Sequence, residues 1–435
     1  MLHITDLRNT DYDPETVMPR AKVEIADASE VVQPIIDKVK EHGAEAVLDF
    51  TERFDGVRPD SLRVPAEALT QALEELGANV RAALEESIDR ARQVHAAQLP
   101  PDTAVPLGEG AAVENHWIPI QRVGLYVPGG RAVYPSSVVM NVVPAQAAGV
   151  PGIAVTSPPQ ADFGGLPHPT ILAACKLLGI EEVYATGGAQ AIAMLALGIE
   201  DDDGTTVCEP VDLITGPGNV YVAAAKQAFF GKVGIDAVAG PSEILVLADE
   251  TAHPTWVAAD LISQAEHDPL AASVLVTTSM DFAQAVVAEI DQQVPGAALE
   301  DQIREALTGQ QSGALVVATL DEAIEVTNAI ATEHLEIQTA DNEAVLEHIT
   351  HAGAVFLGQY APVPLGDYSA GSNHVLPTSG TARFSSGLNT VSFLRLQQRI
   401  RYNKTGLESV ADGIQSLAHS EGLHAHADAI GYRFE

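Results

Sequence analysis

Two kinds of hydrophobic pattern divide the chain. Up to about residue 100, apolar positions such as Val32, Ile35, Ile36 and Val39 recur at helical spacing, which predicts amphipathic helices. From about Gln121 onward, short β-branched runs alternate with Gly-rich turns and helical stretches. Strand, turn and helix in repeated order indicate a parallel sheet with crossover helices.

The expected strands form two sets along the chain. The first set comprises residues 123–127, 153–157, 183–186 and 213–215, and the second comprises 244–248, 273–277, 314–318 and 354–357. Two sets in 435 residues predict two sheet domains rather than one. The remainder from about residue 385 reads as helical and is too short for a large core of its own.

Composition narrows the classes of partner. The chain has 59 acidic and 23 basic residues, a net charge of -36, which repels phosphate backbones and anionic lipid surfaces. We therefore expect no nucleic acid and no membrane partner, and adaptation to solubility or salt is an alternative meaning of the acidity. The start, Met1 to Asp6, lacks a basic segment, and no apolar run approaches the roughly 18 residues of a membrane span. These features predict a cytoplasmic protein.

Three Gly-rich turns each follow an expected strand. They are Pro128–Gly130, Gly187–Gln190 and Gly216–Asn219. Glycine lets a backbone approach a ligand, and a helix start offers free N–H groups to an anion, so a dinucleotide pyrophosphate would fit. None of the turns is a G-x-G-x-x-G fingerprint followed by a ribose-binding acid. Ordinary tight turns of an α/β protein therefore remain an equal alternative.

Four short polar islands carry the candidate chemistry. They are residues 264–267, 333–334, 367–374 and 421–426, and each contains a carboxylate and a histidine. Such islands supply nitrogen ligands, oxygen ligands and groups that move protons, which is the inventory of a metal-assisted acid/base site. The pattern indicates an enzyme.

Two islands suggest ligands and one suggests bases. Gln264 and His267 are three residues apart in a helical stretch and can reach one ion, although glutamine is a poor zinc ligand. Asp367 lies in an expected loop, where a buried carboxylate is costly unless it is paired or bound to a cation. Glu333 and His334 lie between a helix and a strand; they fit two proton removals, and an ordinary loop pair is the alternative.

A series of long motifs, taken in order, resembles the histidinol dehydrogenase family. They are Val123–Gly130, Gly187–Ala191, Gly216–Asn219, Ala239–Glu243, Ser263–His267, Glu333–Leu335 and Gly371–Thr378. The resemblance implies a homodimer with one Zn2+ per subunit. It also implies oxidation of L-histidinol through L-histidinaldehyde to L-histidine with two NAD+, the last reactions of histidine biosynthesis.

The resemblance also assigns roles to residues. It implies that Glu333 and His334 are the catalytic pair, with His334 as base for the alcohol step and Glu333 activating water for the aldehyde step. The implied zinc ligands are Gln264, His267, Asp367 and His426, the last contributed by the tail of the partner subunit. The implied substrate contacts are Ser242, Gln264, His267, His334, Asp367, Glu421 and His426. The implied NAD contacts are Tyr126, Gln190 and Asn219, and His374 is expected to line the pocket.

The same resemblance implies the domain organisation of an α/β protein. Two Rossmann-like domains with incomplete parallel sheets are accompanied by an N-terminal helical segment and a C-terminal helical tail. The expected parts are an N-terminal segment 1–22, a substrate and zinc domain made of 23–126 with 242–384, an NAD-binding domain 127–241, and a tail 385–435 that reaches the partner.

Other functions use similar residues. A zinc hydrolase also pairs an acid and a base beside its metal. A cysteine-dependent aldehyde dehydrogenase would need an activated thiolate at Cys175 or Cys208, the two cysteines of the chain. A non-catalytic binding protein descended from an enzyme is a third alternative. Related enzymes oxidise other amino alcohols or sulfonated diols; Glu421 favours a cationic amino group over a sulfonate.

Overall fold

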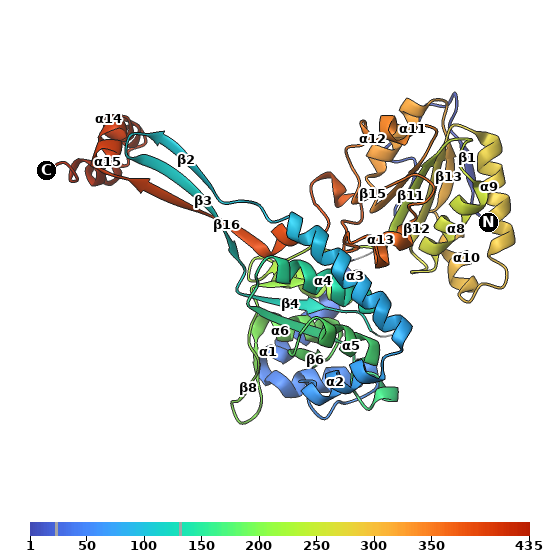
Figure 1. Cartoon of the computed structure of the whole chain (residues 1–435), viewed down its shortest axis with the longest axis horizontal. Helices are drawn as coiled ribbons and strands as arrows, with labels where there is room; N and C mark the ends of the chain where they lie inside the picture. Colours follow the sequence, from blue (N-terminus) through green and yellow to red (C-terminus); the bar gives the residue numbers. More distant parts are fainter. Residues whose placement is uncertain (22–24, 130–132) are drawn as a thin grey trace.

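The computed structural model describes residues 1–21, 25–129 and 133–435. Gly130 of the first expected Gly-rich turn, and the expected boundary at residues 22 and 23, lie outside these ranges. Figure 1 shows two α/β lobes side by side and an arm that projects from one of them to the C-terminus. No helix in the described ranges is both long enough and apolar enough to cross a membrane.

The first lobe is built on a five-stranded parallel sheet of order β10-β9-β4-β5-β6. Its strands are β4 (Arg122–Tyr126), β5 (Gly152–Ser157), β6 (Val183–Ala185), β9 (Leu213–Thr215) and β10 (Gly234–Ile235). Its crossover helices are α4 (Pro135–Ala147), α5 (Pro169–Leu177), α6 (Gly188–Leu197) and α7 (Val220–Phe229). The chain steps outward from β4 to β6 and then returns to β9 on the other side of β4. The two directions diverge between β4 and β9, the position where open α/β sheets bind ligands at their carboxyl edge.

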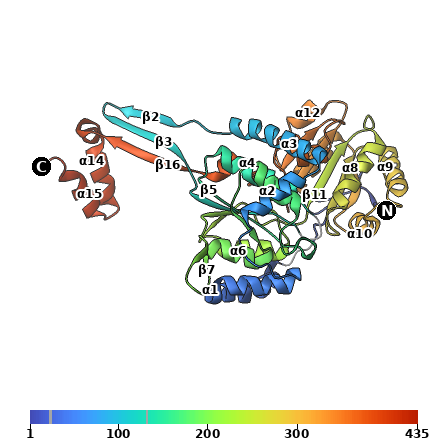
Figure 2. The same ribbon diagram turned by 60° about the horizontal axis from the view of Figure 1, so that its bottom comes forward.

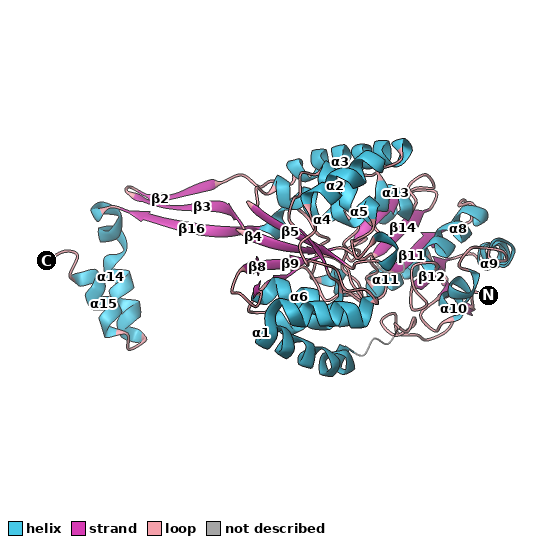
Figure 3. Ribbon diagram, turned by 90° about the horizontal axis from the view of Figure 1, so that it is seen from below, coloured by secondary structure: helices cyan, strands magenta, loops and turns pink. Residues whose placement is uncertain are grey.

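The expected N-terminal helices cover both faces of this sheet. They are α1 (Ile25–Asp55), α2 (Ala66–Glu75) and α3 (Ala78–Ala97). Helix α1 packs on α6 and α7, whereas α2 packs on α5 and α3 on α4 (Figure 3). Val32 and Val47 of α1 share a hydrophobic core with Ile192 and Val222. The apolar faces of α1 to α3 and the strand β4 therefore belong to the five-stranded sheet, whereas the expected division, which groups 23–126 with 242–384, stays a prediction.

The second lobe is a six-stranded parallel sheet of order β1-β13-β12-β11-β14-β15. Its strands are β1 (Ile4–Asp6), β11 (Glu243–Ala248), β12 (Ala272–Thr277), β13 (Gly313–Val316), β14 (His334–Gln338) and β15 (Ala354–Leu357). Its helices are α8 (Pro254–Ala265), α9 (Met280–Gln293), α10 (Glu300–Thr308), α11 (Leu320–Ile330), α12 (Asn342–Leu346) and α13 (Val363–Tyr368). Residues near the start of the chain form the edge strand β1, which pairs with β13. Both expected sets of strands are confirmed.

The arm is a three-stranded antiparallel sheet followed by two helices, best seen in Figures 1 and 3. It consists of β2 (Thr103–Gly108), β3 (Ala111–Pro119), β16 (Leu394–Tyr402), α14 (Lys404–Ser420) and α15 (His424–Gly431). Strand β16 pairs with β3 from Leu394 opposite Pro119 to Tyr402 opposite Ala111. The helical tail is present, but the expectation that all of 385–435 is helical is wrong at β16. That strand is stabilised by pairing with a segment far away in the sequence.

Candidate active site

A buried acid/base pair lies where strands β11 and β14 begin. Glu333 Oε2 accepts a hydrogen bond of 2.9 Å from the backbone N–H of Glu243, and His334 Nδ1 lies 3.1 Å from the carbonyl oxygen of Glu243. His334 Nδ1 is also 3.5 Å from Glu333 Oε2. One backbone unit on β11 therefore orients both members of the pair through the pairing of β11 with β14.

The environment of His334 fixes the form of its imidazole. A carbonyl oxygen can only accept, so Nδ1 carries the proton that it donates to Glu243. The other nitrogen, Nε2, is buried and has no hydrogen-bond partner among the described residues. Burial, together with the nearby imidazoles of His267 and His374, lowers the pKa of His334 to about 3 and outweighs the hydrogen bond to Glu243, which raises it. His334 thus presents a neutral imidazole with a free lone pair, which is the form of a general base.

Glu333 has the opposite shift. Burial raises the pKa of Glu333 well above its usual range, and the carboxylates of Glu243 and Asp367 add to the rise. The backbone N–H of Glu243 and a hydrogen bond from the Ser242 side chain act against it. A carboxylate with a raised pKa is a stronger base than an ordinary glutamate, so this group is suited to deprotonate water.

Side chains from three other segments surround the pair. Burial raises the pKa of Asp367 to about 6 and lowers that of His267. The pKa of His374 falls to about 4 because the ring is buried. His374 Nδ1 lies 3.9 Å from Asp367 Oδ1, and its Nε2 lies 3.2 Å from the hydroxyl of Ser137 in the first turn of α4. The last contact joins the two lobes at this site.

Gln264, near the end of α8, has a buried amide that is free to bind a ligand. Its side chain is 1% exposed, and neither its amide oxygen nor its amide nitrogen has a partner among the described residues. A buried amide without hydrogen bonds costs free energy, which a ligand at its oxygen would offset. Together with His267 and Asp367, Gln264 offers oxygen and nitrogen donors from a single chain. This donor set fits a zinc ion that takes its remaining ligand from elsewhere.

Two of the expected site residues do not join this cluster. Glu421 follows α14 and His426 lies in α15, and both are exposed on the arm, far from the second lobe in Figure 1. Correspondingly, no group of three His, Cys, Asp or Glu side chains in the described ranges could hold a metal ion. The expected ligand set is incomplete within one chain.

The local structure at the metal-ligand candidates differs in two details from expectation. Asp367 belongs to the short helix α13 and not to a loop. His267 follows the end of α8 and is held by a hydrogen bond of 3.2 Å from its backbone N–H to the carbonyl of Gln264. Both residues nevertheless reach the start of the strands, because α8 and α13 end on that side of the sheet.

The expected cofactor contacts lie at the carboxyl edge of the five-stranded sheet. Tyr126 ends β4, and its hydroxyl accepts a hydrogen bond of 3.2 Å from the backbone N–H of Gly188. Gln190 is 1% exposed, and both of its amide atoms lack partners among the described residues. Asn219 caps the start of α7 by accepting from the backbone N–H groups of Tyr221 and Val222. The structure therefore brings Tyr126, Gln190 and Asn219 to one edge.

A buried ion pair supports the turn before α7. The ammonium of Lys226 pairs with the carboxylate of Asp236 and donates to the carbonyl of Gly216 at 3.1 Å. Asp236 in turn accepts from the backbone N–H of Gly216 at 2.8 Å. Gly216 has a φ of 114°, and an added Cβ would lie 2.0 Å from the carbonyl oxygen of Tyr126. The turn therefore requires glycine and is clamped directly over the end of β4.

Sequence reasoning missed three residues that organise the acid/base pair. Glu243 acts through its backbone atoms, so no side-chain pattern reveals it. Arg20 donates to Glu243 Oε1 at 2.6 Å across a long separation in sequence. Ser137 meets His374 from the other lobe. Only the Gly-Pro-Ser-Glu motif that contains Glu243 gave a signal.

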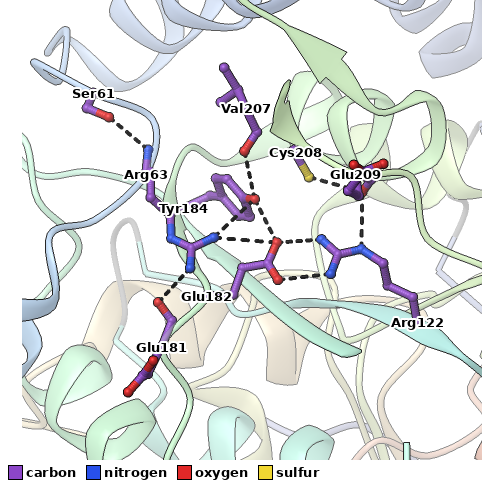
Figure 4. Close-up of polar contacts among 9 residues, drawn as sticks. All are labelled: Ser61, Arg63, Arg122, Glu181, Glu182, Tyr184, Val207, Cys208 and Glu209. Atoms are coloured by element: carbon purple, nitrogen blue, oxygen red, sulfur yellow. Dashed lines mark hydrogen bonds and ion pairs between the residues drawn. The ribbon is translucent and has the colours of Figure 1, made fainter. Parts of the chain in front are cut away.

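The two cysteines lie in surroundings that oppose thiolate chemistry. Cys175 is fully buried in α5, and burial raises its pKa to about 12. Cys208 ends β8 (Thr206–Cys208), donates to the carbonyl of Glu209 at 3.4 Å, and also has a raised pKa because it is buried. Figure 4 places it beside a network in which Glu182 accepts from Arg122 and Tyr184. Arg122 of this network is the first residue of β4, whereas Tyr126 is the last. Cys208 therefore lies at the opposite end of the strand from the expected cofactor contacts, and a cysteine nucleophile is disfavoured.

A groove of about 820 Å³ lies elsewhere in the first lobe. It runs between α1 and the hairpin of β7 (Ile199–Glu200) and β8. Its lining mixes both charges, with Lys38, Arg53, Glu45 and Asp202 among its residues. Cys208 lines it, whereas none of the expected catalytic, metal-ligating, substrate or cofactor residues does.

Two parallel α/β lobes, one with a buried base and one with polar residues at the carboxyl edge of its sheet, are typical of a two-domain α/β dehydrogenase. Comparison with known proteins identifies the family. A family model described as histidinol dehydrogenase matches residues 18–434. The histidinol dehydrogenase of Thermobifida fusca is 56% identical over 428 residues, which is 98% of this chain and 96% of the relative. That of Nocardia farcinica is 57% identical over 418 residues, or 96% and 94% of the two chains.

A solved structure agrees with the sequence comparison. The crystal structure of histidinol dehydrogenase from Elizabethkingia anophelis matches with a TM-score of 0.93 at 33% identity, covering 100% of this chain and 98% of that one. The chain belongs to the histidinol dehydrogenase family and is an oxidoreductase of the dehydrogenase type. The resemblance of the motifs is thereby confirmed, and the zinc hydrolase alternative is disfavoured.

Proposed function

We propose that the protein oxidises L-histidinol to L-histidine through L-histidinaldehyde, with two NAD+ as acceptors, in the final steps of histidine biosynthesis. The observation that carries this proposal is the neutral, buried His334, whose Nε2 is free and whose neighbours include the imidazole of His267. A base, an acid with a raised pKa and a set of metal donors in one place suit an alcohol oxidation followed by an aldehyde oxidation.

The zinc ion of this proposal is held by Gln264, His267 and Asp367 together with His426 of the partner subunit. The unpartnered amide of Gln264 supports the assignment, because a bound cation would satisfy its oxygen. When bound, zinc would act as a Lewis acid toward the imidazole and amino group of the substrate. Ser242, His334 and the partner subunit's Glu421 complete the proposed substrate contacts.

His334 acts in the alcohol step. Its Nε2 takes the proton of the substrate hydroxyl while hydride leaves the carbinol carbon, and NAD+, when bound, supplies the hydride acceptor. The Nδ1–H bond to the carbonyl of Glu243 keeps the ring in the required tautomer and stabilises the imidazolium that forms. His374 lines the pocket beside Asp367 and holds the contact with Ser137 of the other lobe.

Glu333 acts in the aldehyde step. The aldehyde must add water before it can lose a second hydride, and the Glu333 carboxylate removes a proton from that water. Its raised pKa makes it an effective base, and the hydrogen bond from the backbone N–H of Glu243 fixes one of its oxygens.

The cofactor side of the site is assigned to the first lobe. We propose that residues 127–241, with α1 to α3 packed around them, bind NAD+ through Tyr126, Gln190 and Asn219. The unpartnered amide of Gln190 supports this assignment, as does the position of these residues where the sheet order diverges. Residues 242–384 then hold zinc and substrate.

The arm supports a homodimer in the proposal. Its large apolar side chains are exposed in a single chain: Ile400 is 74% exposed and Leu417 is 67% exposed. Exposed apolar surface of this kind is typical of a protein interface. A second copy that covers the arm would also receive Glu421 and His426 at its own site, which would complete the ligand set.

The stoichiometry of NADH tests the two-step proposal. Purified, zinc-loaded protein is given limiting L-histidinol and excess NAD+, and NADH and L-histidine are measured at completion. Two NADH per histidinol are expected. One NADH with accumulated aldehyde would contradict the role of Glu333. Oxidation of a sulfonated diol in preference to histidinol would contradict the substrate assignment.

Hybrid dimers test the shared site. Chains carrying Glu333→Ala are mixed with chains carrying His426→Ala under conditions of subunit exchange. Neither parent pool is expected to form L-histidine, whereas hybrids regain one site that does. His424→Ala, also exposed in α15, serves as the control for damage to the arm. Hybrids without recovered activity would contradict the cross-subunit ligand.

A further inference from the structure

The end of helix α1 lies against the cofactor edge of the first lobe. Thr51, one turn before the end, is buried, and its hydroxyl lies 2.9 Å from that of Thr186. Thr186 directly follows β6, and its carbonyl accepts from Thr156 in β5. Asp55, the last residue of α1, is four residues after Thr51 and shares its face of the helix. Helix α1 therefore places Asp55 near the carboxyl ends of β5 and β6.

The carboxylate of Asp55 has an oxygen without a partner. Asp55 Oδ2 is buried and accepts no hydrogen bond from the described residues. Burial raises the pKa of Asp55 to about 6, and its charge contributes to the raised pKa of the Tyr126 phenol. A buried carboxylate oxygen without a donor is costly unless something outside the chain satisfies it.

Asp55 is one of two such groups around the same phenol. The Tyr126 hydroxyl accepts from Gly188, and an added Cβ on Gly188 would lie 2.8 Å from Gln190 Oε1. Gln190 is the other residue whose buried polar atoms lack partners. Unsatisfied acceptors and donors thus converge beside Tyr126, at the edge where a dinucleotide is expected.

Asp55 does not stabilise the end of helix α1. A carboxylate in the last turn of a helix opposes the helix dipole, which favours cations at that end. Arg53 is the basic residue of the last turn of α1, and Asp55 follows it at the terminus. A half-buried acid with an unpartnered oxygen, at a helix position that disfavours negative charge, points to a role in binding.

We propose that Asp55 accepts a hydrogen bond from the 2′-hydroxyl of the adenosine ribose of NAD+ and thereby selects NAD+ over NADP+. This inference rests on the proposed function, because it assumes that the cofactor binds at this edge. Many dinucleotide sites place an acid on the ribose at the end of a later strand. Here the acid comes from a helix that precedes the first strand of the sheet, which explains why no turn is followed by a ribose-binding acid.

The same carboxylate would discriminate against a phosphate. NADP+ carries a 2′-phosphate, and its negative charge would lie against the buried Asp55 oxygen without a compensating cation there among the described residues. Replacing the carboxylate with a neutral amide of the same shape removes this repulsion and weakens the acceptor. Asp55→Asn should therefore lower affinity for NAD+ and raise relative affinity for NADP+.

Direct binding measurements test the inference without turnover. NAD+, NADP+ and 2′-deoxy-NAD+ are titrated calorimetrically into the full-length parent, into Asp55→Asn, and into Asp60→Asn, the same change at an exposed position. The parent is expected to bind 2′-deoxy-NAD+ about tenfold more weakly than NAD+, and Asp55→Asn to lose about tenfold for NAD+. The 2′-deoxy penalty should largely disappear in Asp55→Asn and persist in Asp60→Asn.

The outcomes separate the inference from the proposed function. If the parent binds NAD+ but does not distinguish the 2′-deoxy analogue, Asp55 does not hold the hydroxyl, whatever the variant does. The inference would also be overturned if Asp55→Asn bound NAD+ as tightly as the parent and kept the same preference for NAD+ over NADP+. NAD+ would then still be the cofactor. A parent that binds no NAD+ would overturn the cofactor assignment itself.

Discussion

The two parallel sheets use opposite edges. The five-stranded sheet presents Tyr126, Gln190 and Asn219 at its carboxyl edge, where turns and helix starts approach a ligand. The six-stranded sheet presents Glu333 and His334 at the amino ends of its strands, where the backbone of β11 orients them. The carboxyl-edge rule for open α/β sheets therefore describes one lobe and not the other.

The difference separates two kinds of site. On the first sheet, backbone geometry dominates, as in the clamp of Lys226 and Asp236 over Gly216. On the second sheet, burial sets the protonation of side chains, with His334 neutral and the pKa of Glu333 raised. Changes at the carboxyl edge of the five-stranded sheet should therefore affect cofactor binding. Changes at the amino ends of the strands of the six-stranded sheet should affect proton transfer.

The largest expected effect is on the acid/base edge. His334→Asn should lower kcat for histidinol by about a hundredfold to ten-thousandfold, because general-base catalysis contributes that much. Zinc content and NAD+ affinity should stay at the parent values, measured by metal analysis and calorimetry. His348→Asn, an exposed histidine near the same sheet, is the control. A kcat within a few-fold of the parent with zinc retained would refute the base assignment.

The next effect is on the cofactor edge. Lys226→Met removes one partner of the buried ion pair and leaves the charge of Asp236 uncompensated. The free energy of unfolding, measured in urea, should therefore fall by about 3–5 kcal/mol. Affinity for NAD+ should fall with it, because the Gly216 turn loses its support. Lys232→Met changes an exposed lysine nearby and should have little effect. Unchanged stability of Lys226→Met would show that the pair does not hold the turn.

The pH profiles of the two steps should differ. A general base works only when deprotonated, so activity falls as pH drops through its pKa. The pKa of Glu333 is raised and that of His334 is lowered to about 3, so aldehyde oxidation should be lost at a higher pH than alcohol oxidation. Single-turnover rates with L-histidinol and with added L-histidinaldehyde measure this directly. If the two rates fell at the same pH, the assignment of His334 to the alcohol step and Glu333 to the aldehyde step would be contradicted.

The smallest effect is expected at Tyr126. Tyr126→Phe removes the acceptor for the Gly188 N–H, a hydrogen bond of 3.2 Å, and should raise the KM for NAD+ by about fivefold with kcat nearly unchanged. Tyr360→Phe, at an exposed tyrosine, provides the matched control. An equal loss of kcat in Tyr126→Phe would place this phenol in the chemical step instead.

Much of the fold could be predicted from local pattern. The β-branched runs at 123–127 and 244–248 became β4 and β11, because buried parallel strands read as continuous apolar segments. Strands β3 and β16 were missed, since the pairing that stabilises them joins residues that are far apart in sequence. Periodicity within one segment carries no information about such a partner.

The site was predicted more fully in its residues than in its arrangement. The motifs singled out Glu333, His334, Gln264 and Asp367, and the structure gathers them, but their position at the amino ends of strands did not follow from any turn signal. The role of Glu243 depends on two backbone atoms and the register of β11 with β14. Such contacts depend on tertiary structure.

Calorimetric titration of NAD+ into two variants tests the separation of the edges most directly. Gln190→Ala changes the cofactor edge, and His334→Asn changes the acid/base edge. We predict that Gln190→Ala binds NAD+ about tenfold more weakly with zinc retained, because it removes the unpartnered amide. His334→Asn should bind NAD+ as tightly as the parent while forming almost no NADH. Equal weakening of NAD+ binding in both variants would contradict the account.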